Sequence, residues 1–292
     1  MATHLGLIGG SGLYGLPLEG AEWREVDTPW GAPSDAILTG TLDGLPVSFL
    51  PRHGRGHVHA PGELPSRANV AALKALGVTD VLSISAVGSF REAMAPGHLV
   101  VVDQIVDRTV ARPASFFGTG CVAHVSLAQP TCPRLSALAA EAAEATGATV
   151  HRGGTYLCME GPQFSSRAES RIWRDSWGCD VIGMTAMPEA RLAREAELCY
   201  AIVAMVTDYD SWLEGHGAVD VSAVLAVLAA NVARGRDLAL RLPGRLGPDA
   251  PGQAHPCPHG CDRALDHAVM TAPDRRDPSL VERLRAVAGR VL

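Results

Sequence analysis

Residues 81–90 read VLSISAVGSF, an apolar run that ends in small hydroxyl residues and glycine. Such a run is typical of a strand that is buried on both faces of a sheet. Similar β-rich runs lie before and after it, and they alternate with segments whose apolar residues recur at helical spacing. This alternation predicts an α/β fold, in which a single mixed sheet is flanked by helices.

Strands and helices are predicted along most of the chain. The predicted strands are residues 5–8, 36–39, 47–50, 81–85, 99–106, 156–159, 181–183 and 200–206. The predicted helices are residues 66–76, 133–146, 166–177, 188–198 and 219–240, with two short amphipathic ones at 261–270 and 279–291. A Gly- and Pro-rich linker at 241–256 precedes the last two. Because such a tail is too small to hold a core alone, we expect a body of residues 1–245 and a helical C-terminal tail of residues 246–292 that docks on the same or a neighbouring subunit.

Composition and charge narrow the possible classes of protein. The chain has 292 residues, 47% of them hydrophobic and 19% charged, which is ordinary for a globular protein. A formal net charge of −6 leaves no basic surplus, so we expect no nucleic-acid partner. The longest apolar run, residues 198–206, is shorter than the ~20 residues of a membrane-spanning helix. The N-terminus shows no secretory signal pattern, so we expect a cytoplasmic protein without a membrane segment.

Seven cysteines are scattered through the chain, an odd number that does not suggest a disulfide scaffold, so most are expected to be reduced. Near the C-terminus, Cys257, Cys261, His255 and His259 form a conceivable zinc site. Their spacing fits no familiar zinc finger and a second cysteine pair is missing, so we expect no metal. A structural cysteine pair at a helix start and a labile disulfide are the alternatives.

A glycine-rich loop, GLIGGSGLYG at residues 6–15, follows the first predicted strand. Glycines let backbone N–H groups approach an anion, and Ser11 adds a hydroxyl donor, so the loop is a candidate phosphate cradle. A tight structural turn would contain the same residues. A dinucleotide-binding loop is less well supported, because GGSG lacks the GxGxxG spacing.

A second candidate anion site is LPRHGRGHVH, residues 50–59, at the exit of the strand at 47–50. Arg52, His53, Arg55 and His57 form the dense cluster of donors that an oxyanion site needs. A solvated basic loop is the alternative, since arginine clusters on loops are common.

Two other segments place residues suited to ligand binding at the end of a predicted strand. Ser85, Ala86 and Gly88 fit the carboxyl end of a strand, where open α/β sheets bind their ligands, although a plain strand-to-turn transition would look alike. Phe164 lies in YLCMEGPQFSSR, residues 156–167, at a turn where an aromatic face can stack on a planar ring. A core position for this side chain is the alternative.

An acidic pair, Asp208 and Asp210, follows the apolar strand at residues 200–206. If the extended geometry persists, both carboxylates point to the same side. Mutual repulsion and desolvation then raise the pKa of one of them, so that it stays protonated near neutral pH and serves as a general acid. Two solvated turn aspartates are the alternative.

The chain resembles the methylthioadenosine phosphorylase branch of the trimeric purine nucleoside phosphorylases in a series of motifs: GLIGGSGLY, PRHGRGH, SRANVAALK, ISAVGSF, DQIVDRT, EGPQFSSRAES, GMTAMPEARLAREA and TDYDSW. The resemblance covers about residues 5–240. It implies a homotrimer, or a hexamer, of α/β subunits that cleave the glycosidic bond of a purine nucleoside. Inorganic phosphate is the implied co-substrate, and no metal or organic cofactor is implied.

The resemblance also implies roles for matching residues. Asp208 would donate a proton to N7 of the purine, and Asp210 would accept a hydrogen bond from a 6-amino group. Members of the family often carry Thr at the positions of Ser11 and Ser85, which keeps the hydroxyl. The implied phosphate site comprises Ser11, Arg52, His53, Ser85, Ala86 and Thr185, with Met184 against the ribose and Phe164 beside the base.

Substrate choice follows from positions at which related enzymes differ. Phosphorylases of inosine and guanosine are similar but usually carry Glu at the position of Ser165 and Asn at that of Asp208. Ser165 offers no anionic acceptor for the N1–H of a 6-oxopurine, so the resemblance favours a 6-aminopurine. Val221, with Val224 one turn on, stands where those enzymes place a His near the 5′-hydroxyl. An apolar lining there suits a methylthio group, although valines on a helix more often face a core.

Two further residues suggest a site shared between subunits. His124 lies in a segment with which trimers of the family complete a neighbour's 5′ pocket, and Met270 in the tail is expected to do likewise. Cleavage of methylthioadenosine is therefore the first hypothesis. The alternatives are a phosphorylase of methylthioinosine, 5′-deoxyadenosine or a 6-oxopurine nucleoside such as inosine or guanosine, an oxidoreductase built on residues 6–15, and a zinc or interaction module in the tail.

Overall fold

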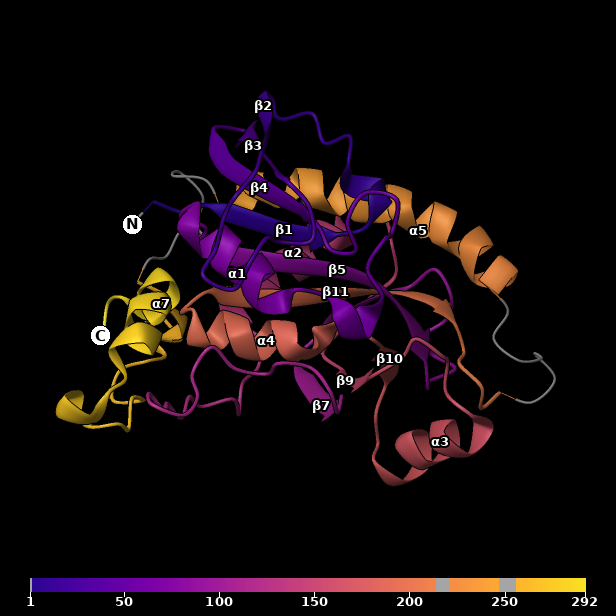
Figure 1. Ribbon diagram of the computed structural model, residues 1–292. Coiled ribbons are helices and arrows are strands. Elements are labelled where there is room, and N and C mark those ends of the chain that lie inside the picture. Colours follow the sequence, from indigo (N-terminus) through magenta and orange to yellow (C-terminus); the bar gives the residue numbers. More distant parts are fainter. Residues whose placement is uncertain (1, 214–220, 247–255) are drawn as a thin grey trace.

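Residues 81–90 fall at the centre of the sheet, within and just after β5, Asp80–Ser89. This strand pairs in parallel with β1, Leu5–Gly9, along one edge and with β11, Cys199–Asp208, along the other. Its last residues also pair, antiparallel, with β10, Val181–Gly183. The computed structural model describes residues 2–213, 221–246 and 256–292, and within them the strands form one mixed sheet (Figure 1).

The other strands extend the sheet on both sides of this centre. β4, Leu45–Pro51, pairs with β1, and β3 and β2 follow it to one edge. On the other side β10 leads through β9 to β7, while β6 and β8 continue from β11. The bounds of these strands are Glu19–Arg24 for β2, Ile37–Leu42 for β3, Leu99–Val102 for β6, Gln104–Arg108 for β7, Val150–Arg152 for β8 and Thr155–Met159 for β9.

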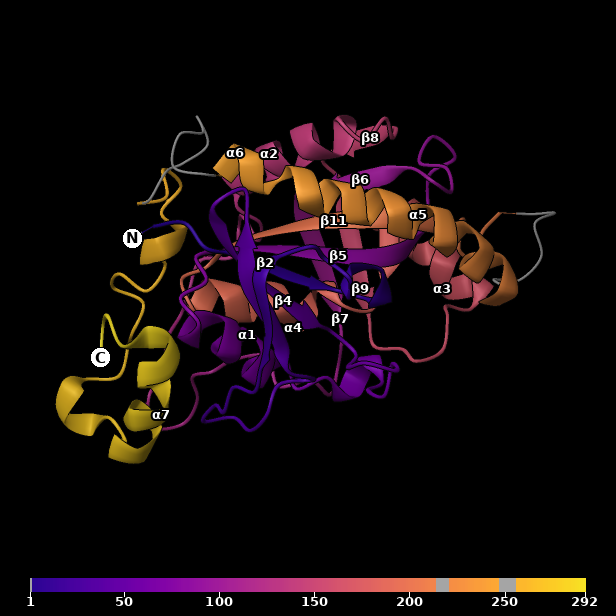
Figure 2. The same ribbon diagram turned by 90° about the horizontal axis from the view of Figure 1, so that it is seen from above.

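Helices cover both faces of the sheet (Figure 2). On one face lie α1, Ser66–Ala75, and α4, Ala186–Glu195; on the other lie α2, Pro133–Glu144, and α5, Val221–Arg241. Among the described residues, no helix combines the length and apolar content needed to cross a bilayer. The remaining helical elements are α3 Arg167–Arg171, a π-helical turn at Ile172–Ser176, α6 Pro243–Leu246, α7 Pro278–Ala288, and 3-10 turns at Ser11–Leu13, Pro61–Glu63, Cys261–Arg263 and Pro273–Arg275.

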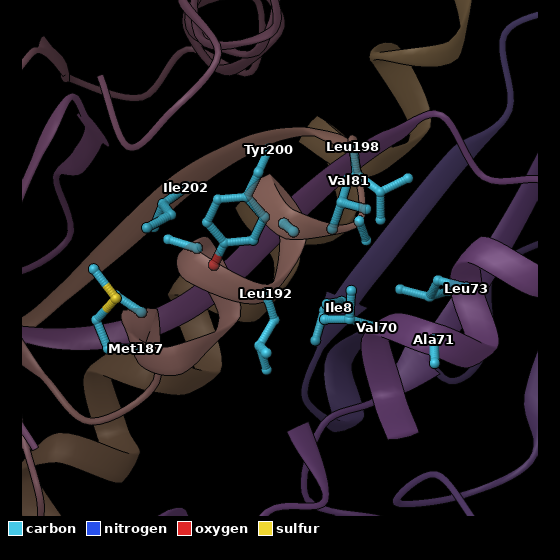
Figure 3. Packing of buried hydrophobic residues seen from close by; sticks show 14 of the residues in the cluster. Ile8, Val70, Ala71, Leu73, Val81, Met187, Leu192, Leu198, Tyr200 and Ile202 are labelled. Carbon is cyan, nitrogen blue, oxygen red and sulfur yellow. The ribbon is translucent and has the colours of Figure 1, made fainter. Parts of the chain in front are cut away.

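The core on the α1 and α4 face is one buried hydrophobic cluster (Figure 3). Val70 and Leu73 of α1 and Leu192 of α4 belong to it, together with Val81 and Tyr200 of the central strands. Burial of each large apolar side chain contributes about 1.5–3 kcal/mol. Because both faces of the sheet are covered in this way, the central strands read as nearly continuous apolar runs, as the sequence predicted.

The sheet differs from the prediction in several places. The single strand expected at 99–106 is two strands, β6 and β7, with Asp103 between them. β6 pairs with β11, whereas β7 pairs with β9. There Asp103 Oδ1 accepts the Gly154 N–H at 3.0 Å. All residues of β2 are exposed, so this edge strand has no apolar pattern that could have predicted it. β8 is a three-residue strand that the prediction also missed.

The helix predicted at residues 261–270 is wrong. Only the 3-10 turn Cys261–Arg263 forms there, and further along Val269 pairs with Ala123 in an antiparallel bridge. The Met270 N–H donates to the Val122 carbonyl at 2.8 Å. Pairing with a distant extended segment therefore outweighs the amphipathic pattern that favoured a helix.

The tail ends in α7, which packs on α1 of the same chain (Figure 1). Leu284, Val287 and Ala288 are buried in the same cluster as the α1 side chains. Asp277 caps the helix by accepting the Leu280 N–H at 2.9 Å. The described part of the tail thus contributes to the core of the body.

Candidate active site

A cavity of about 480 Å³ lies at the carboxyl ends of the central strands β1, β4, β5 and β11. In open α/β sheets this is where ligands bind. The loops after β1 and β4 border it, together with the second half of β5 and the end of β11. The residues singled out in the sequence that line it are Arg52, His53, His57, Ser85, Ala86, Gly88, Phe164, Met184, Thr185, Asp208 and Asp210.

Arg52 borders the cavity as a buried ion pair. Its Nε lies 2.6 Å from Glu189 Oε1, and its Nη1 donates to the Ile84 carbonyl at 2.9 Å. Its Nη2 donates to Ser83 Oγ at 2.6 Å and to the Ile8 carbonyl at 3.3 Å. These bonds use the Nε–H, both Nη2–H groups and one Nη1–H. The guanidinium is therefore held in one orientation at the wall of the cavity.

Glu189, which the sequence analysis did not single out, is the centre of this network. Besides Arg52, it accepts hydrogen bonds at Oε2 from the Tyr200 hydroxyl at 2.9 Å and from Ser83 Oγ at 3.0 Å. Burial raises the pKa of Tyr200 well above its usual range, so its hydroxyl stays a donor. In the sequence Glu189 looks like an ordinary acidic residue in the first turn of a helix, and nothing there signals its burial.

His53, one of the cluster of donors that the sequence suggested, is a neutral side chain. Burial lowers the pKa of His53 to about 4. Its Nδ1 lies 2.9 Å from the His59 carbonyl, which requires a proton on Nδ1 and leaves Nε2 as an acceptor. The ring stacks on His57, with centroids 4.2 Å apart. Arg55 is not among the residues that line the cavity; it pairs with Asp35 at 2.7 Å.

Ser85 supplies a buried hydroxyl to the cavity. Its Oγ has no hydrogen-bond partner among the described residues. A buried polar atom without a partner costs about 1–3 kcal/mol, so such an atom calls for an explanation. Thr185 lies nearby in the lining, immediately before α4, with its Oγ1 at 3.4 Å from the Tyr156 hydroxyl. The simplest explanation is that a bound ligand forms the hydrogen bond that the Ser85 hydroxyl lacks.

The glycine-rich loop enters the cavity through Gly10 and Gly12. A Cβ at Gly12 would lie 2.4 Å from Val232 Cγ1 of α5, so only glycine allows this approach. The loop leads from β1 into a 3-10 turn and not into an α-helix, unlike the loop of a dinucleotide-binding fold. The side chain of Ser11 is outside the part of the chain that the structure describes.

Asp208 and Asp210 both line the cavity, but not through the extended geometry that the sequence suggested. β11 ends at Asp208, and Asp210 has a positive φ of 50°, so the chain turns between them. Asp208 Oδ1 accepts the Asp210 N–H at 2.8 Å, and its Oδ2 accepts the Thr207 hydroxyl at 2.8 Å. The turn therefore brings the two carboxyl groups together.

Asp210 is the carboxyl group whose pKa is raised. Burial is the main cause, and the negative charge of Asp208 adds to it. Ser165 opposes the shift, because its hydroxyl donates to Asp210 from 2.6 and 2.7 Å. Ser165 is not among the residues that line the cavity; it reaches the site through Asp210. Gly88 makes room for the pair, since a Cβ there would lie 2.9 Å from Asp208 Oδ1.

Phe164 and Met184 form part of the apolar wall. Phe164 is 47% exposed, so it is not a core side chain. Met184 is held through its carbonyl, which accepts Nη1 of Arg112 at 2.6 Å. Arg112 also binds the Met187 carbonyl at 2.7 Å and Glu160 Oε1 at 2.9 Å. This buried arginine, which the sequence analysis missed, fastens the two segments that carry the wall.

A second apolar part of the wall comes from Leu13, Met205, Val232 and Gly235. Val232 and Gly235 belong to α5, the helix on which Val221 and Val224 were predicted to line a 5′ pocket. The side chains of Val221 and Val224 are outside the described residues. The helix does contribute an apolar surface, at positions about two turns beyond Val224.

His124 and Met270 lie together, but not among the residues of the cavity. Their segments pair through the bridge between Ala123 and Val269, and the His124 N–H donates to the Ala268 carbonyl at 2.9 Å. Met270 is 62% exposed. Both side chains therefore stand on the surface of this chain.

The sequence of the chain is similar to a known family over most of its length. Residues 4–242 match the model of the phosphorylase superfamily. Over 293 aligned residues the chain is 67% identical to a protein of Cereibacter sphaeroides named S-methyl-5'-thioadenosine phosphorylase, with 100% of this chain and 99% of that protein covered.

Solved structures show the same similarity in three dimensions. A methylthioadenosine phosphorylase from an antarctic soil metagenomic library superposes with a TM-score of 0.90 at 40% identity, covering 98% of this chain and 99% of that one. Methylthioadenosine phosphorylase from Schistosoma mansoni in complex with adenine superposes with a TM-score of 0.79 at 36% identity, covering 84% and 92%. The mixed sheet and its helices are thus those of these enzymes.

Proposed function

The chain belongs to the phosphorylase superfamily, and we propose that it cleaves the N-glycosidic bond of S-methyl-5'-thioadenosine with inorganic phosphate. The products are adenine and 5-methylthioribose 1-phosphate. One observation carries the proposal: a single cavity joins a buried unpaired hydroxyl and a fixed guanidinium to two carboxyl groups and an apolar wall. The names of the relatives support it.

Atoms and electrons balance in the proposed reaction. An oxygen of phosphate bonds to C1′ of the ribose as the bond between C1′ and N9 breaks. The electron pair of the broken bond goes to the purine, which takes up a proton at N7 and leaves as neutral adenine. Positive charge that develops on the ribose is stabilised by the phosphate, and protonation stabilises the leaving base. Phosphate is a co-substrate, and the reaction needs no organic cofactor.

The phosphate lies on the side of the cavity formed by Arg52, His53, Ser85, Ala86 and Thr185, with Ser11 from the glycine-rich loop. The Ser85 hydroxyl then gains the partner that it lacks among the described residues. Arg52 is held in a fixed position by its ion pair with Glu189 and has one Nη1–H left for the phosphate. Because His53 is neutral and offers Nε2 as an acceptor, it binds a protonated oxygen of the phosphate.

The purine lies between Phe164 and the two carboxyl groups. In the roles that the resemblance implies, Asp208 donates the proton to N7 and Asp210 accepts a hydrogen bond from the 6-amino group, although Asp210 is the carboxyl group whose pKa is raised. The Ser165 hydroxyl orients Asp210 for this task. A 6-aminopurine is favoured because a 6-oxopurine would leave buried polar groups without partners.

The sugar lies against Met184, and its 5′-methylthio group lies against an apolar surface to which α5 contributes. Leu13, Met205 and Val232 offer such a surface in this chain, with Val221 and Val224 as further candidates. An apolar lining accepts a thioether and leaves a 5′-hydroxyl without a hydrogen-bond partner.

The active assembly is a homotrimer in the cytoplasm. His124 and Met270 complete the 5′ pocket of a neighbouring subunit, which accounts for two exposed side chains on a surface segment held by paired backbone. Light scattering of the purified protein tests this arrangement. A mass of one chain together with full activity would rule it out.

The deciding experiment compares phosphorolysis of methylthioadenosine, adenosine, methylthioinosine and inosine side by side, with and without phosphate. We expect adenine to be released from methylthioadenosine only with phosphate, and with the largest kcat/KM of the four. Faster cleavage of methylthioinosine or inosine would point instead to a related nucleoside phosphorylase. No phosphate-dependent release of a base from any of them would overturn the proposal.

A further inference from the structure

Four buried cysteines meet where the tail joins the body. Cys132 and Cys199 come from the body, and Cys257 and Cys261 come from the tail. All four Sγ atoms lie within 4.8 Å of one another, and all four residues are buried. None of the four lines the cavity of the candidate active site. We propose that these four thiols bind a zinc ion that fastens the tail to the body.

The spacing of the sulfur atoms suits a tetrahedral metal. Zinc–thiolate bonds of about 2.3 Å in tetrahedral geometry place neighbouring sulfurs about 3.8 Å apart. Cys132 Sγ and Cys257 Sγ are 3.8 Å apart, and the remaining separations stay within 4.8 Å. A small contraction would complete the tetrahedron. Four soft sulfur ligands in this arrangement are typical of zinc, with iron as the main competitor.

Backbone hydrogen bonds hold each pair of cysteines in place. In the body, the Cys132 N–H donates to the Tyr200 carbonyl at 2.7 Å, which ties it to the residue after Cys199. In the tail, the Cys257 N–H donates to Asp262 Oδ1 at 3.0 Å. The Gly260 N–H donates to the Cys257 carbonyl at 2.9 Å and closes the turn before Cys261. The ligands are therefore organised without the metal, which favours its binding.

The charge of the site also has a counterpart. Zinc with four thiolates carries a net charge of −2, and its formation releases the four thiol protons. The guanidinium of Arg134 lies beside Cys199 and pairs with the buried Asp80. The positive side chain beside the sulfurs is shared with Asp80, so it offsets only a small part of the buried negative charge.

The alternative is a disulfide, as the sequence suggested for Cys257 and Cys261. All seven cysteines are free thiols in the structure. The second cysteine pair that the tail lacks in sequence is supplied by the fold: Cys132 lies 125 residues from Cys257. Since this pair completes a set of four, zinc accounts for the whole cluster, whereas a disulfide between Cys257 and Cys261 would leave Cys132 and Cys199 unexplained.

The test measures metal in the full-length, untagged protein, purified with a reductant and without chelators. By elemental mass spectrometry we expect about one zinc per chain in the unaltered protein. Cys257→Ser and Cys132→Ser should each lose most of it. Cys179→Ser is the matched control, because Cys179 is equally buried but not part of the cluster, and it should keep the full zinc content.

A spectroscopic measurement on the unaltered protein keeps the proposal testable if the serine variants fail to fold. Protein produced in cobalt-supplemented medium should show the intense visible absorption of tetrahedral thiolate-bound cobalt. Zinc absent from the reduced protein, zinc retained in full by Cys257→Ser, or iron in its place would each overturn the proposal. The proposal would also be overturned if the intact mass of freshly purified protein, measured without reductant, showed that the four cysteines form disulfides.

Discussion

The Ser165 hydroxyl lies 2.6 and 2.7 Å from the two carboxylate oxygens of Asp210, a residue 45 positions away in sequence. Both side chains are buried. A second bond, from Ser211 Oγ to the Ser165 carbonyl at 3.0 Å, holds the same two segments together. The orientation of a carboxyl group in the cavity therefore depends on a side chain that does not itself line it.

Ser165→Ala tests this dependence. A hydrogen bond to a charged group contributes about 1.5–3 kcal/mol, so we expect kcat/KM for methylthioadenosine to fall about 10- to 100-fold. Without this donor the pKa of Asp210 rises further, so the acid limb of the pH–rate profile moves to higher pH. The control is Ser166→Ala, which removes an exposed cap of α3 and costs about 1 kcal/mol of stability. Equal effects of the two substitutions on kcat/KM would contradict the role of Ser165.

Asp208→Asn tests the proton donor. Loss of general acid catalysis costs about 100- to 10,000-fold, so kcat/KM for methylthioadenosine should fall within that range. The ratio of activity on methylthioinosine to that on methylthioadenosine should rise, because an amide complements a 6-oxopurine. Asp210→Asn is the comparison that separates the two carboxyl groups. Because Asp210 is proposed to contact the 6-amino group, Asp210→Asn should change this ratio as well, with a smaller loss of kcat/KM. If Asp210→Asn loses more kcat/KM than Asp208→Asn, the two roles are exchanged.

Glu189→Gln tests the buried ion pair behind the phosphate site. Removing one partner leaves the buried charge of Arg52 uncompensated, which costs about 3–5 kcal/mol of unfolding free energy. We also expect KM for phosphate to rise, because the guanidinium loses its fixed orientation. Glu195→Gln is the control: Glu195 is buried in the same helix but bonds to Ser115 and Phe116. A rise in KM for phosphate of similar size in both variants would argue against a specific role of Glu189.

Ser85→Ala separates ligand binding from stability. The hydroxyl has no partner among the described residues, so its removal should leave the melting temperature unchanged or slightly higher. If the hydroxyl binds phosphate, KM for phosphate should rise about 10-fold or more. Ser85→Thr keeps the hydroxyl and should retain affinity. An unchanged KM for phosphate in Ser85→Ala would exclude Ser85 from the phosphate site.

The lowered pKa of His53 predicts how the stability of the protein depends on pH. Its pKa is lowered to about 4 in the folded protein, against an ordinary value of 6.5. Between these values the unfolded chain binds a proton that the folded one does not, so stability falls as pH drops from about 6.5 toward 4. His53→Gln should lose less stability than the unaltered protein between pH 7 and about 5, as measured by urea unfolding. Parallel declines in the two proteins would show that folding does not lower the pKa of His53 as described.

Much of the site could be predicted because it follows strands. An apolar run marks a strand, and ligands gather where parallel strands end, so Arg52 and Asp208 were found just after such runs and Ser85 at the end of a predicted strand. The partners that hold Arg52 and Met184 in place were not found. Glu189 and Arg112 are buried charges whose roles depend on contacts with distant segments, and no local pattern distinguishes them from surface residues.

Local geometry was the least predictable part. The turn at Asp210 depends on a positive φ and on a bond to Asp208, neither of which alternation along a strand can reveal. The tail segment at 261–270 has an amphipathic pattern but pairs with residue 123 instead. The cysteine cluster shows the same limit: the spacing of Cys257 and Cys261 alone suggested no metal site, because their neighbours in space lie far away in sequence.

The docking of α7 on α1 sets a limit on how the chain can be shortened. The superfamily match stops at residue 242, yet Leu284, Val287 and Ala288 complete a hydrophobic cluster that begins with β1. A truncated version ending at α6 would uncover apolar side chains of α1 and invite aggregation. The boundary of the recognisable catalytic region is therefore not the boundary of an independently folding unit, and crystallisation or engineering efforts should retain the last helix.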